Sequence, residues 1–340
     1  MHADLNESWF ILLSLKLDNT LCGSGLPIKG GQSLPNSQFN AAAPEEKSEM
    51  SEINQRVESD CPVFREGSSA DDLLTEGLSV GISILPNHPC LLPSNNLKLV
   101  SFLMGLPHPS IIVLGDSINS HNVKAMWNMK KGRKTPSDEE ALSLALEAAA
   151  PFREAFTRSL NHLEEERPDK SGWVKLHPWL DIQGEHMRLQ QDVAKKHYEN
   201  GGLLKTRIDE IAVTFLKHRR PMSKNHTARL PHLVAYLLAE LPFLLVGAEM
   251  NGHHYAGLLY PLAAQALSSP IAMEMFDLIH DIHTLEEFTG LRDQITELTA
   301  TGKLGLPGVI LFPMETTDTT SEAKSSKPKL FERQSSAVGA

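Results

Sequence analysis

A short apolar run reads Leu78-Ser-Val-Gly-Ile-Ser-Ile-Leu85 and ends at Pro86 and Asn87. An apolar run of this length that stops at turn residues predicts a buried strand followed by a turn. A second run, Ser110-Ile-Ile-Val-Leu-Gly115, has the same character. Continuously apolar strands that alternate with helices are typical of parallel sheets covered on both faces. We therefore predict an α/β, Rossmann-like fold with a mainly parallel sheet and helices on both faces.

The alternating pattern lies between residues 76 and 313, which we expect to form one domain. Helices are expected over 137–166, 185–199, 203–216, 230–247, 271–283 and 285–299, and further strands over 256–261 and 308–312. Ser137 is the expected N-cap of the first helix, because Glu140 completes a capping box. Residues 1–75 and 314–340 are polar with little periodicity, so we expect a mostly disordered acidic extension and a disordered tail.

The formal net charge is -10, which by itself argues against a nucleic-acid partner. Residues 1–77 hold thirteen acidic residues against five Lys or Arg, so the remainder carries only -2. Within that remainder, the segments 117–135 and 215–232 each contain five Lys or Arg and no acid. Such segments can neutralise phosphates, although charge alone favours solvated surface for both.

The three cysteines, Cys22, Cys61 and Cys90, suit neither a disulfide framework nor a zinc knuckle. A reducing, cytoplasmic compartment is the expectation that follows. The apolar run from Trp9 to Leu15 is too short to span a bilayer and lacks the basic flank of a secretory signal. We find no other stretch of membrane-helix length and expect no membrane partner.

Ser83 is the first candidate for chemistry, because it stands where the predicted strand meets its turn. Open α/β sheets bind ligands outside the carboxyl ends of their strands. Gly81 lies on the same strand face and has no side chain, which would leave room for a substrate. Taken alone, Ser83 is more typical of a small strand-end residue, and no GxSxG elbow surrounds it.

Tyr236 and Glu240 stand four residues apart on the apolar helix expected over 230–247, so they share one helical face. A buried carboxylate is costly unless it is paired or functional, and it could bind an ammonium group or accept its proton. A Glu that reaches solvent beside a core Tyr fits the pattern equally well. Tyr260 ends the strand Gly257-Leu-Leu-Tyr260, where its phenol could bind a ligand or cap the core.

The histidines give no support for a metal site. His253 and His254 are adjacent and diverge, whereas His280 and His283 lie at i, i+3 without a motif such as HExxH. Neither GxGxxG nor GxxxxGK[ST] follows a strand, so no nucleotide cofactor is indicated. We expect neither a metal nor a cofactor.

Together these features resemble the tRNA-dependent cyclodipeptide synthases over about residues 78–312. Four blocks in order carry the resemblance: Val80-Gly-Ile-Ser83, Ile112-Val-Leu-Gly-Asp-Ser-Ile-Asn-Ser-His-Asn-Val123, Ala235-Tyr-Leu-Leu-Ala-Glu-Leu-Pro242 and Leu258-Leu-Tyr-Pro261. No single block is specific, but their order and the twenty-residue step from Glu240 to Tyr260 are similar to the family's pattern.

The resemblance implies a fold similar to class I aminoacyl-tRNA synthetase catalytic domains and an ATP-independent activity without a metal. Ser83 falls on the nucleophile that accepts the first aminoacyl group from an aminoacyl-tRNA. Tyr236 and Glu240 fall on the pair that holds its α-amine and relays protons, and Tyr260 on a tyrosine that lines the site. The aminoacyl-enzyme would become a dipeptidyl-enzyme and then close to a cyclic dipeptide. The further residues expected to line the substrate site are Gly81, Asn87, Asn122 and Leu258.

Pro261 after Tyr260 is similar to the Tyr-Pro branch of the family. In that branch the asparagine found elsewhere three residues after the serine is missing, and here Pro86 occupies its place. The branch and the long extensions resemble fungal members that incorporate arginine, which implies arginyl-tRNA as one substrate. Asp116 and Glu249 are candidates to hold the guanidinium group, although a solvent-facing acid is the preferred interpretation of each.

A basic region of the family contacts tRNA, and the segment after Asn122 matches it in place. The cations expected to bind tRNA are Lys124, Lys130, Lys131, Arg133, Lys134, Arg153 and Arg158. Tailoring enzymes of a biosynthetic pathway are further expected partners. Two alternatives stay open: a non-catalytic tRNA-binding relative of synthetase domains, and a Rossmann-like nucleotide-binding enzyme.

Overall fold

The computed structural model describes residues 62–64, 69, 72, 77–85, 88–127, 135–219, 226–263 and 270–315. Asn87 and four of the predicted tRNA-binding cations, Lys130, Lys131, Arg133 and Lys134, lie outside these residues. So does most of the extension and the tail expected at 1–75 and 314–340, and both stay predictions.

The centre of the molecule is a six-stranded sheet in the order β1-β8-β7-β2-β3-β4. The strands are β1 (Val63–Phe64), β2 (Leu78–Ile82), β3 (Ser110–Leu114), β4 (Val174–Pro178), β7 (Gly257–Ala263) and β8 (Val309–Met314). All neighbours are parallel except β1, which runs antiparallel to β8 at the edge. The mainly parallel sheet predicted from the apolar runs is therefore confirmed.

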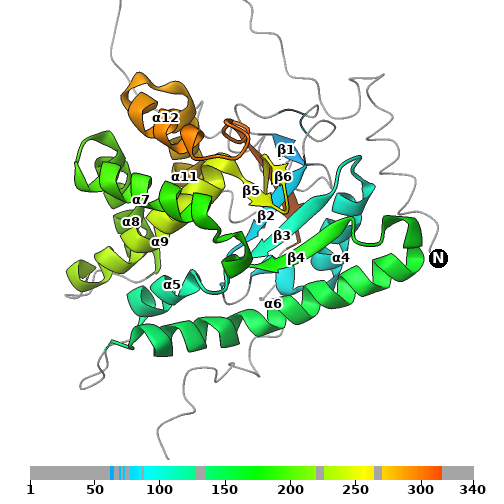
Figure 1. Cartoon of the computed structure of the whole chain (residues 1–340). Coiled ribbons are helices and arrows are strands. Elements are labelled where there is room, and N and C mark those ends of the chain that lie inside the picture. Colours follow the sequence, from blue (N-terminus) through cyan, green and yellow to red (C-terminus); the bar gives the residue numbers. More distant parts are fainter. Residues whose placement is uncertain are drawn as a thin grey trace, which may run out of the picture.

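Helices cover both faces of this sheet, as predicted (Figure 1). One face carries α4 (Pro93–Gly105) and α6 (Asp138–Glu166). The other carries α7 (Glu185–Glu199), α8 (Leu203–Arg219), α9 (His226–Val246), α11 (Pro270–Thr284) and α12 (Thr289–Glu297). A short helix, α5 (Asn119–Met126), contacts both α6 and α9. The predicted capping box of α6 is present at Ser137 and Glu140.

The alternation of side chains along β2 assigns its residues to two separate cores. Leu78, Val80 and Ile82 pack with α4 and α6. Ser79, Gly81 and Ser83 alternate with them and so point toward the face covered by α9. The small residues of β2 thus all face the apolar helix that carries Tyr236 and Glu240.

The order of the strands reverses between β2 and β7. From β2 the chain proceeds to β3 and β4 on one side, and it later returns to β7 and β8 on the other. Parallel sheets bind ligands outside the carboxyl ends of their strands at such a reversal of strand order. Ser83 follows β2 and Tyr260 lies in β7, so both belong to the two strands at this reversal.

Several elements were not anticipated from the sequence. β4 reads Val-Lys-Leu-His-Pro and has too little apolar character to announce a strand. A two-stranded hairpin, β5 (Ala248–Met250) with β6 (His253–Tyr255), precedes β7. β7 itself extends to Ala263 by pairing with β8, so the prediction that Tyr260 ends this strand is wrong.

Helix α9 is the most apolar helix of the described chain. Its stretch Thr227–Val246 is long and apolar enough to cross a membrane by length and composition, contrary to the expectation that no such stretch exists. In the structure 61% of the most apolar part of this helix is buried by the rest of the chain, and that part includes Glu240. The core helix of a soluble protein meets the same criteria of length and composition. Helix α9 packs against α5, α7 and α8.

Gly247 ends α9 and permits the hairpin to fold back onto it. It has a φ of +82°, and a Cβ at this position would lie 2.0 Å from the carbonyl oxygen of Tyr255. We expect Gly247→Ala to lower the free energy of unfolding by about 3 kcal/mol or more, because backbone strain and a clash with backbone combine. Urea unfolding monitored by circular dichroism measures this.

Gly252→Ala is the matched control for Gly247→Ala. Gly252 has a similar φ of +78°, but a Cβ there would meet nothing within 4 Å. Only the conformational cost applies, so we expect a loss of about 1 kcal/mol. Equal losses for the two variants would contradict the proposed close contact.

Candidate active site

The structure brings together four residues singled out in the sequence: Ser83, Tyr236, Glu240 and Tyr260. Ser83 Oγ lies 3.0 Å from the Tyr260 hydroxyl oxygen. The Tyr236 hydroxyl donates a hydrogen bond of 3.2 Å to Glu240 Oε1. Ser83 also lowers the pKa of the Tyr236 phenol, against the larger rise that burial causes. Ser83 therefore interacts with both phenols.

Burial makes the Glu240 carboxyl group an unusually weak acid. It raises the pKa of this carboxyl group from 4.5 to about 7, and the hydrogen bond from Tyr236 offsets only part of the rise. An ammonium group placed beside Glu240 would lower this pKa again, because an opposite charge favours the ionised form. Glu240 is thus a carboxyl group that can both hold a proton and release it near neutral pH.

The two tyrosines stay protonated. Burial, and next the charge of Glu240, raise the pKa of Tyr260 to about 12, and the same two causes raise the pKa of Tyr236 well above its usual value. Both phenols consequently act as hydrogen-bond donors and proton carriers and not as bases. Hydrogen bonds join Tyr260 to Ser83 and Tyr236 to Glu240, and Glu240 is the one member of this group that takes up a proton near neutral pH.

The Tyr260 ring is held in place by packing. It lies edge-on to Phe276 of α11 at 5.3 Å between ring centroids. Its backbone is fixed by the pairing of β7 with β8, where Tyr260 is opposite Leu311. A rigid phenol beside a serine hydroxyl provides a fixed hydrogen bond at the atom proposed to react.

Comparisons with known proteins give a likeness of fold. A scan against protein-family models gives no match, and a search of curated proteins gives none either. Among solved structures, a cyclodipeptide synthase from Bacillus thermoamylovorans is 15% identical, with a TM-score of 0.47 over 76% of this chain and 99% of that one.

Two further solved structures are similar to the chain. AlbC, a cyclodipeptide synthase from Streptomyces noursei, is 16% identical, with a TM-score of 0.43 over 59% of this chain and 87% of that one. A Mycobacterium tuberculosis protein, described as relating cyclodipeptide synthetases to type I tRNA-synthetases, is 18% identical, with a TM-score of 0.45 over 63% and 83%. At these identities and scores, the chemistry has to be inferred from the side chains themselves.

The space beside Gly81 is not available to a substrate, so this part of the prediction is wrong. A Cβ at Gly81 would lie 3.1 Å from the ring of Phe243, which packs edge-on against Trp179. Gly81 is required for the packing of α9 on β2. Leu258, on the neighbouring strand β7, is 2% exposed and packs in the same core as Phe243, so its place in the structure is that of a core residue.

The carboxylate of Asp116 is already bound by other groups of the protein. Oδ1 accepts hydrogen bonds from the backbone N–H groups of Ser117 (2.7 Å) and Trp179 (3.0 Å), and Oδ2 pairs with Arg153 at 3.1 Å. The carboxylate is 1% exposed and joins the end of β3 to α6 and to the turn after β4. This arrangement makes Asp116 a structural residue and corrects its assignment to a substrate guanidinium.

The cations expected to bind tRNA are placed unevenly. Lys124 pairs with Asp138, and only 15% of its side chain is exposed. Arg153 pairs with Asp116 and is half exposed, whereas Arg158 is 70% exposed and lies 3.8 Å from Glu154. Lys124 and Arg153 therefore already have structural partners. Nearby Asn122 donates to Asn119 Oδ1 at 3.3 Å within α5.

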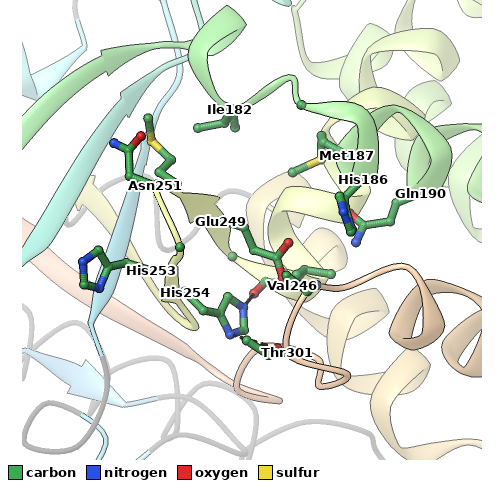
Figure 2. A pocket seen from close by; sticks show the side chains of 15 residues that line it. Ile182, His186, Met187, Gln190, Val246, Glu249, Asn251, His253, His254 and Thr301 are labelled. Atoms are coloured by element: carbon green, nitrogen blue, oxygen red, sulfur yellow. Dashed lines mark hydrogen bonds between the residues drawn. The ribbon is translucent and has the colours of Figure 1, made fainter.

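Glu249 lies in a pocket whose lining includes none of the four candidate catalytic residues (Figure 2). Its Oε1 accepts a hydrogen bond from the N–H of Ala300. His253 and His254 line the same pocket, while His283 on α11 has a pKa lowered to about 4, by burial first and then by Arg292. Within the described residues, no three His, Cys, Asp or Glu side chains converge as metal ligands.

His88 contributes to the site and was missed in the sequence. Its Nδ1 accepts a hydrogen bond of 3.1 Å from the N–H of Cys90, and its own N–H donates to the carbonyl of Leu85. Leu85 in turn donates to the carbonyl of Ser83. Burial lowers the pKa of His88 to about 4, so the ring stays a neutral acceptor. The sequence does contain a sign of this turn: His88 stands directly before Pro89, so its side chain can accept a hydrogen bond from the N–H two residues later.

A prediction about pH dependence follows from the burial of Glu240. A carboxyl group whose pKa is about 7 when folded keeps a proton that the unfolded chain loses near 4.5. The free energy of unfolding contributed by this group therefore falls as pH rises through that interval. Relative to Glu240→Gln, which stays neutral, we expect the wild type to lose about 2–3 kcal/mol between about pH 5 and pH 8. Urea unfolding of both proteins at the two pH values measures this, and a pH-independent difference would show that Glu240 is solvated.

A separate prediction concerns the turn after Ser83. His88→Ala leaves the N–H of the fully buried Cys90 without its acceptor and should cost about 1–3 kcal/mol. His88→Asn offers a side-chain oxygen to the same N–H, as in an Asx-turn, and should recover about half of the loss. Equal unfolding free energies for the two variants would mean that the hydrogen bond is not what His88 contributes.

Proposed function

We propose that this chain joins the aminoacyl groups of two aminoacyl-tRNAs into a cyclic dipeptide, with Ser83 as the covalent nucleophile. The observation that carries the proposal is the group of four side chains at the reversal of strand order, in which Ser83 bonds to Tyr260, Tyr236 bonds to Glu240, and Ser83 acts on the pKa of Tyr236. The resemblance of the surrounding sequence blocks to the cyclodipeptide synthases supports the same assignment.

The first step forms an aminoacyl-enzyme. Ser83 Oγ attacks the ester carbonyl of an aminoacyl-tRNA, the bond from that carbon to the ribose oxygen breaks, and free tRNA leaves. The serine proton can pass through Tyr236 toward Glu240 and is finally taken up by the departing ribose oxygen. The ester is already activated, so the step requires no ATP.

The second step forms the first amide bond. The α-amine of the aminoacyl group on Ser83 attacks the ester carbonyl of a second aminoacyl-tRNA, and the second tRNA leaves. An ammonium group is not a nucleophile, so the amine must first lose a proton. Glu240, with a pKa near 7, suits both tasks, because its carboxylate holds the ammonium group and then accepts the proton.

The last step releases the product. The free amine of the dipeptidyl-enzyme attacks the Ser83 ester carbonyl, the bond from that carbon to Oγ breaks, and the ring closes as a second amide. Tyr236 and Tyr260 stay protonated, so one of them can return a proton to Oγ. Ser83 is regenerated and no cofactor is consumed.

Arginyl-tRNA as one substrate, and the Tyr-Pro branch, stay predictions from the resemblance. Neither acid suggested for the guanidinium group supports them, because Asp116 is paired with Arg153 and Glu249 lies in another pocket. The identity of both amino acids is left to the product.

Expression in bacteria followed by mass spectrometry of the medium tests the activity and names the product. We expect a diketopiperazine with the wild type and none with Ser83→Ala, because the acyl acceptor is absent. An aminoacyl-enzyme should likewise be trapped only with Ser83 present. Ser79→Ala is the matched control, since Ser79 lies four residues earlier, within β2, and donates to the carbonyl of Gly257. Product should persist in this variant.

Product formation by Ser83→Ala would overturn the role of this serine. Binding of tRNA without any product from the wild type would instead favour the non-catalytic relative.

A further prediction concerns the tRNA interface. Lys124 and Arg153 have partners in the structure, so we propose that tRNA binding depends less on them than on the other predicted cations, of which Lys130, Lys131, Arg133 and Lys134 are adjacent in sequence. Changing these four to Gln should reduce the salt dependence of tRNA affinity, with a slope lower by up to about 3. Lys195→Gln, on the exposed face of α7, is the control and should leave the slope unchanged. An unaltered slope in the fourfold variant would move the interface to the segment 215–232.

A further inference from the structure

A pocket lies beside the β5–β6 hairpin, and neither Ser83 nor the other three candidate catalytic residues line it. It has a volume of about 180 Å³ and lies between the β5–β6 hairpin, the start of α7 and the turn at Ala300 and Thr301 (Figure 2). The hairpin leads directly into the start of β7, which is the amino edge of the parallel strands. The pocket is therefore a candidate ligand site that is separate from the proposed catalytic group.

Glu249 gives this pocket its charge. It is the one Asp, Glu, Lys or Arg among the fifteen residues that line the pocket. Its Oε1 accepts the N–H of Ala300 at 2.9 Å, and no Lys or Arg of the described part of the chain forms an ion pair with it. The second carboxylate oxygen is available to a ligand, and a negatively charged wall favours a cation.

Two neighbours add hydrogen-bond acceptors. His186 Nδ1 lies 2.6 Å from the carbonyl oxygen of Leu298, which can only accept, so Nδ1 carries a proton and Nε2 is an acceptor whenever the ring holds a single proton. The Gln190 amide nitrogen donates to the same carbonyl at 3.4 Å, which leaves its oxygen as an acceptor. An ammonium group has three donors and no acceptor, so it matches this set.

Part of the remaining wall is aliphatic: Ile182, Met187, Val246 and Met250 line it. The volume of about 180 Å³ is similar to that of an apolar cavity of about 150 Å³ that binds benzene, so it suits a ligand of about six non-hydrogen atoms. A divalent metal is a poorer match, because no three metal-ligating side chains of the described residues converge here.

We propose that this pocket binds a small primary alkylammonium ion, with the ammonium group on Glu249 and the alkyl chain against Met187 and Met250. The site does not depend on the catalytic proposal, since it shares no residue with it. Figure 2 shows Glu249, His186 and Gln190 around the pocket that the ion would occupy.

Methyl NMR of the full chain labelled with ¹³C at its methionine methyl groups tests the proposal. Pentylammonium is the probe, and 1-pentanol is the neutral control of equal size. We expect saturable shifts of the Met187 and Met250 signals with pentylammonium, and binding of 1-pentanol that is weaker by about tenfold or more, because one charge-assisted contact is lost. Met187→Leu and Met250→Leu assign the two signals.

Glu249→Gln provides the decisive comparison. Its side-chain oxygen still accepts the N–H of Ala300, so the hairpin stays anchored while the charge is removed. We expect pentylammonium to bind this variant at least about tenfold more weakly than the wild type. Equal binding of the two probes, equal binding by Glu249→Gln, or shifts confined to other methionines would each overturn the proposal.

Discussion

The arrangement of the proposed site depends on one costly feature, the placement of the Glu240 carboxyl group on the side of α9 that packs into the molecule, largely out of water. Taking an ionised carboxylate out of water is unfavourable, and the pKa of about 7 is the measure of that cost. The Glu240 carboxyl group accepts a hydrogen bond from Tyr236, and no cation of the described chain forms an ion pair with this group. A carboxyl group left in this state is poised for a partner that carries its own positive charge, as an α-ammonium group does.

The sheet order explains how residues so distant in sequence meet. Ser83 and Tyr260 are 177 positions apart, yet β2 and β7 are direct neighbours because the chain reverses its direction of travel across the sheet. The same neighbourhood requires α9 to approach β2 closely, and Gly81 permits this by admitting the Phe243 ring. Fold and site are therefore linked through packing, because the absence of a side chain at Gly81 lets α9, which carries Glu240, pack closely on β2.

The sequence predicted the parallel sheet and the four residues of the site, because both are expressed in local patterns. Apolar runs announce β2 and β3, and the spacing of Tyr236 and Glu240 places them on one helical face. It could not predict what is decided by packing across the molecule. Phe243 against Gly81, and Arg153 against Asp116, join residues more than 30 positions apart, and the sequence contains no local sign of either contact.

Cationic residues show the same limit most clearly. A segment rich in Lys and Arg appears in the sequence as a surface for phosphates, but charge in a sequence is not the same as charge available to a ligand. Lys124 is mostly buried and paired with Asp138, and Arg153 neutralises a carboxylate that is 1% exposed. Breaking such a pair to bind a phosphate would leave the acid uncompensated, which costs more in the buried pair than in the exposed one. Phosphate binding therefore favours the cations that hold no acid of their own.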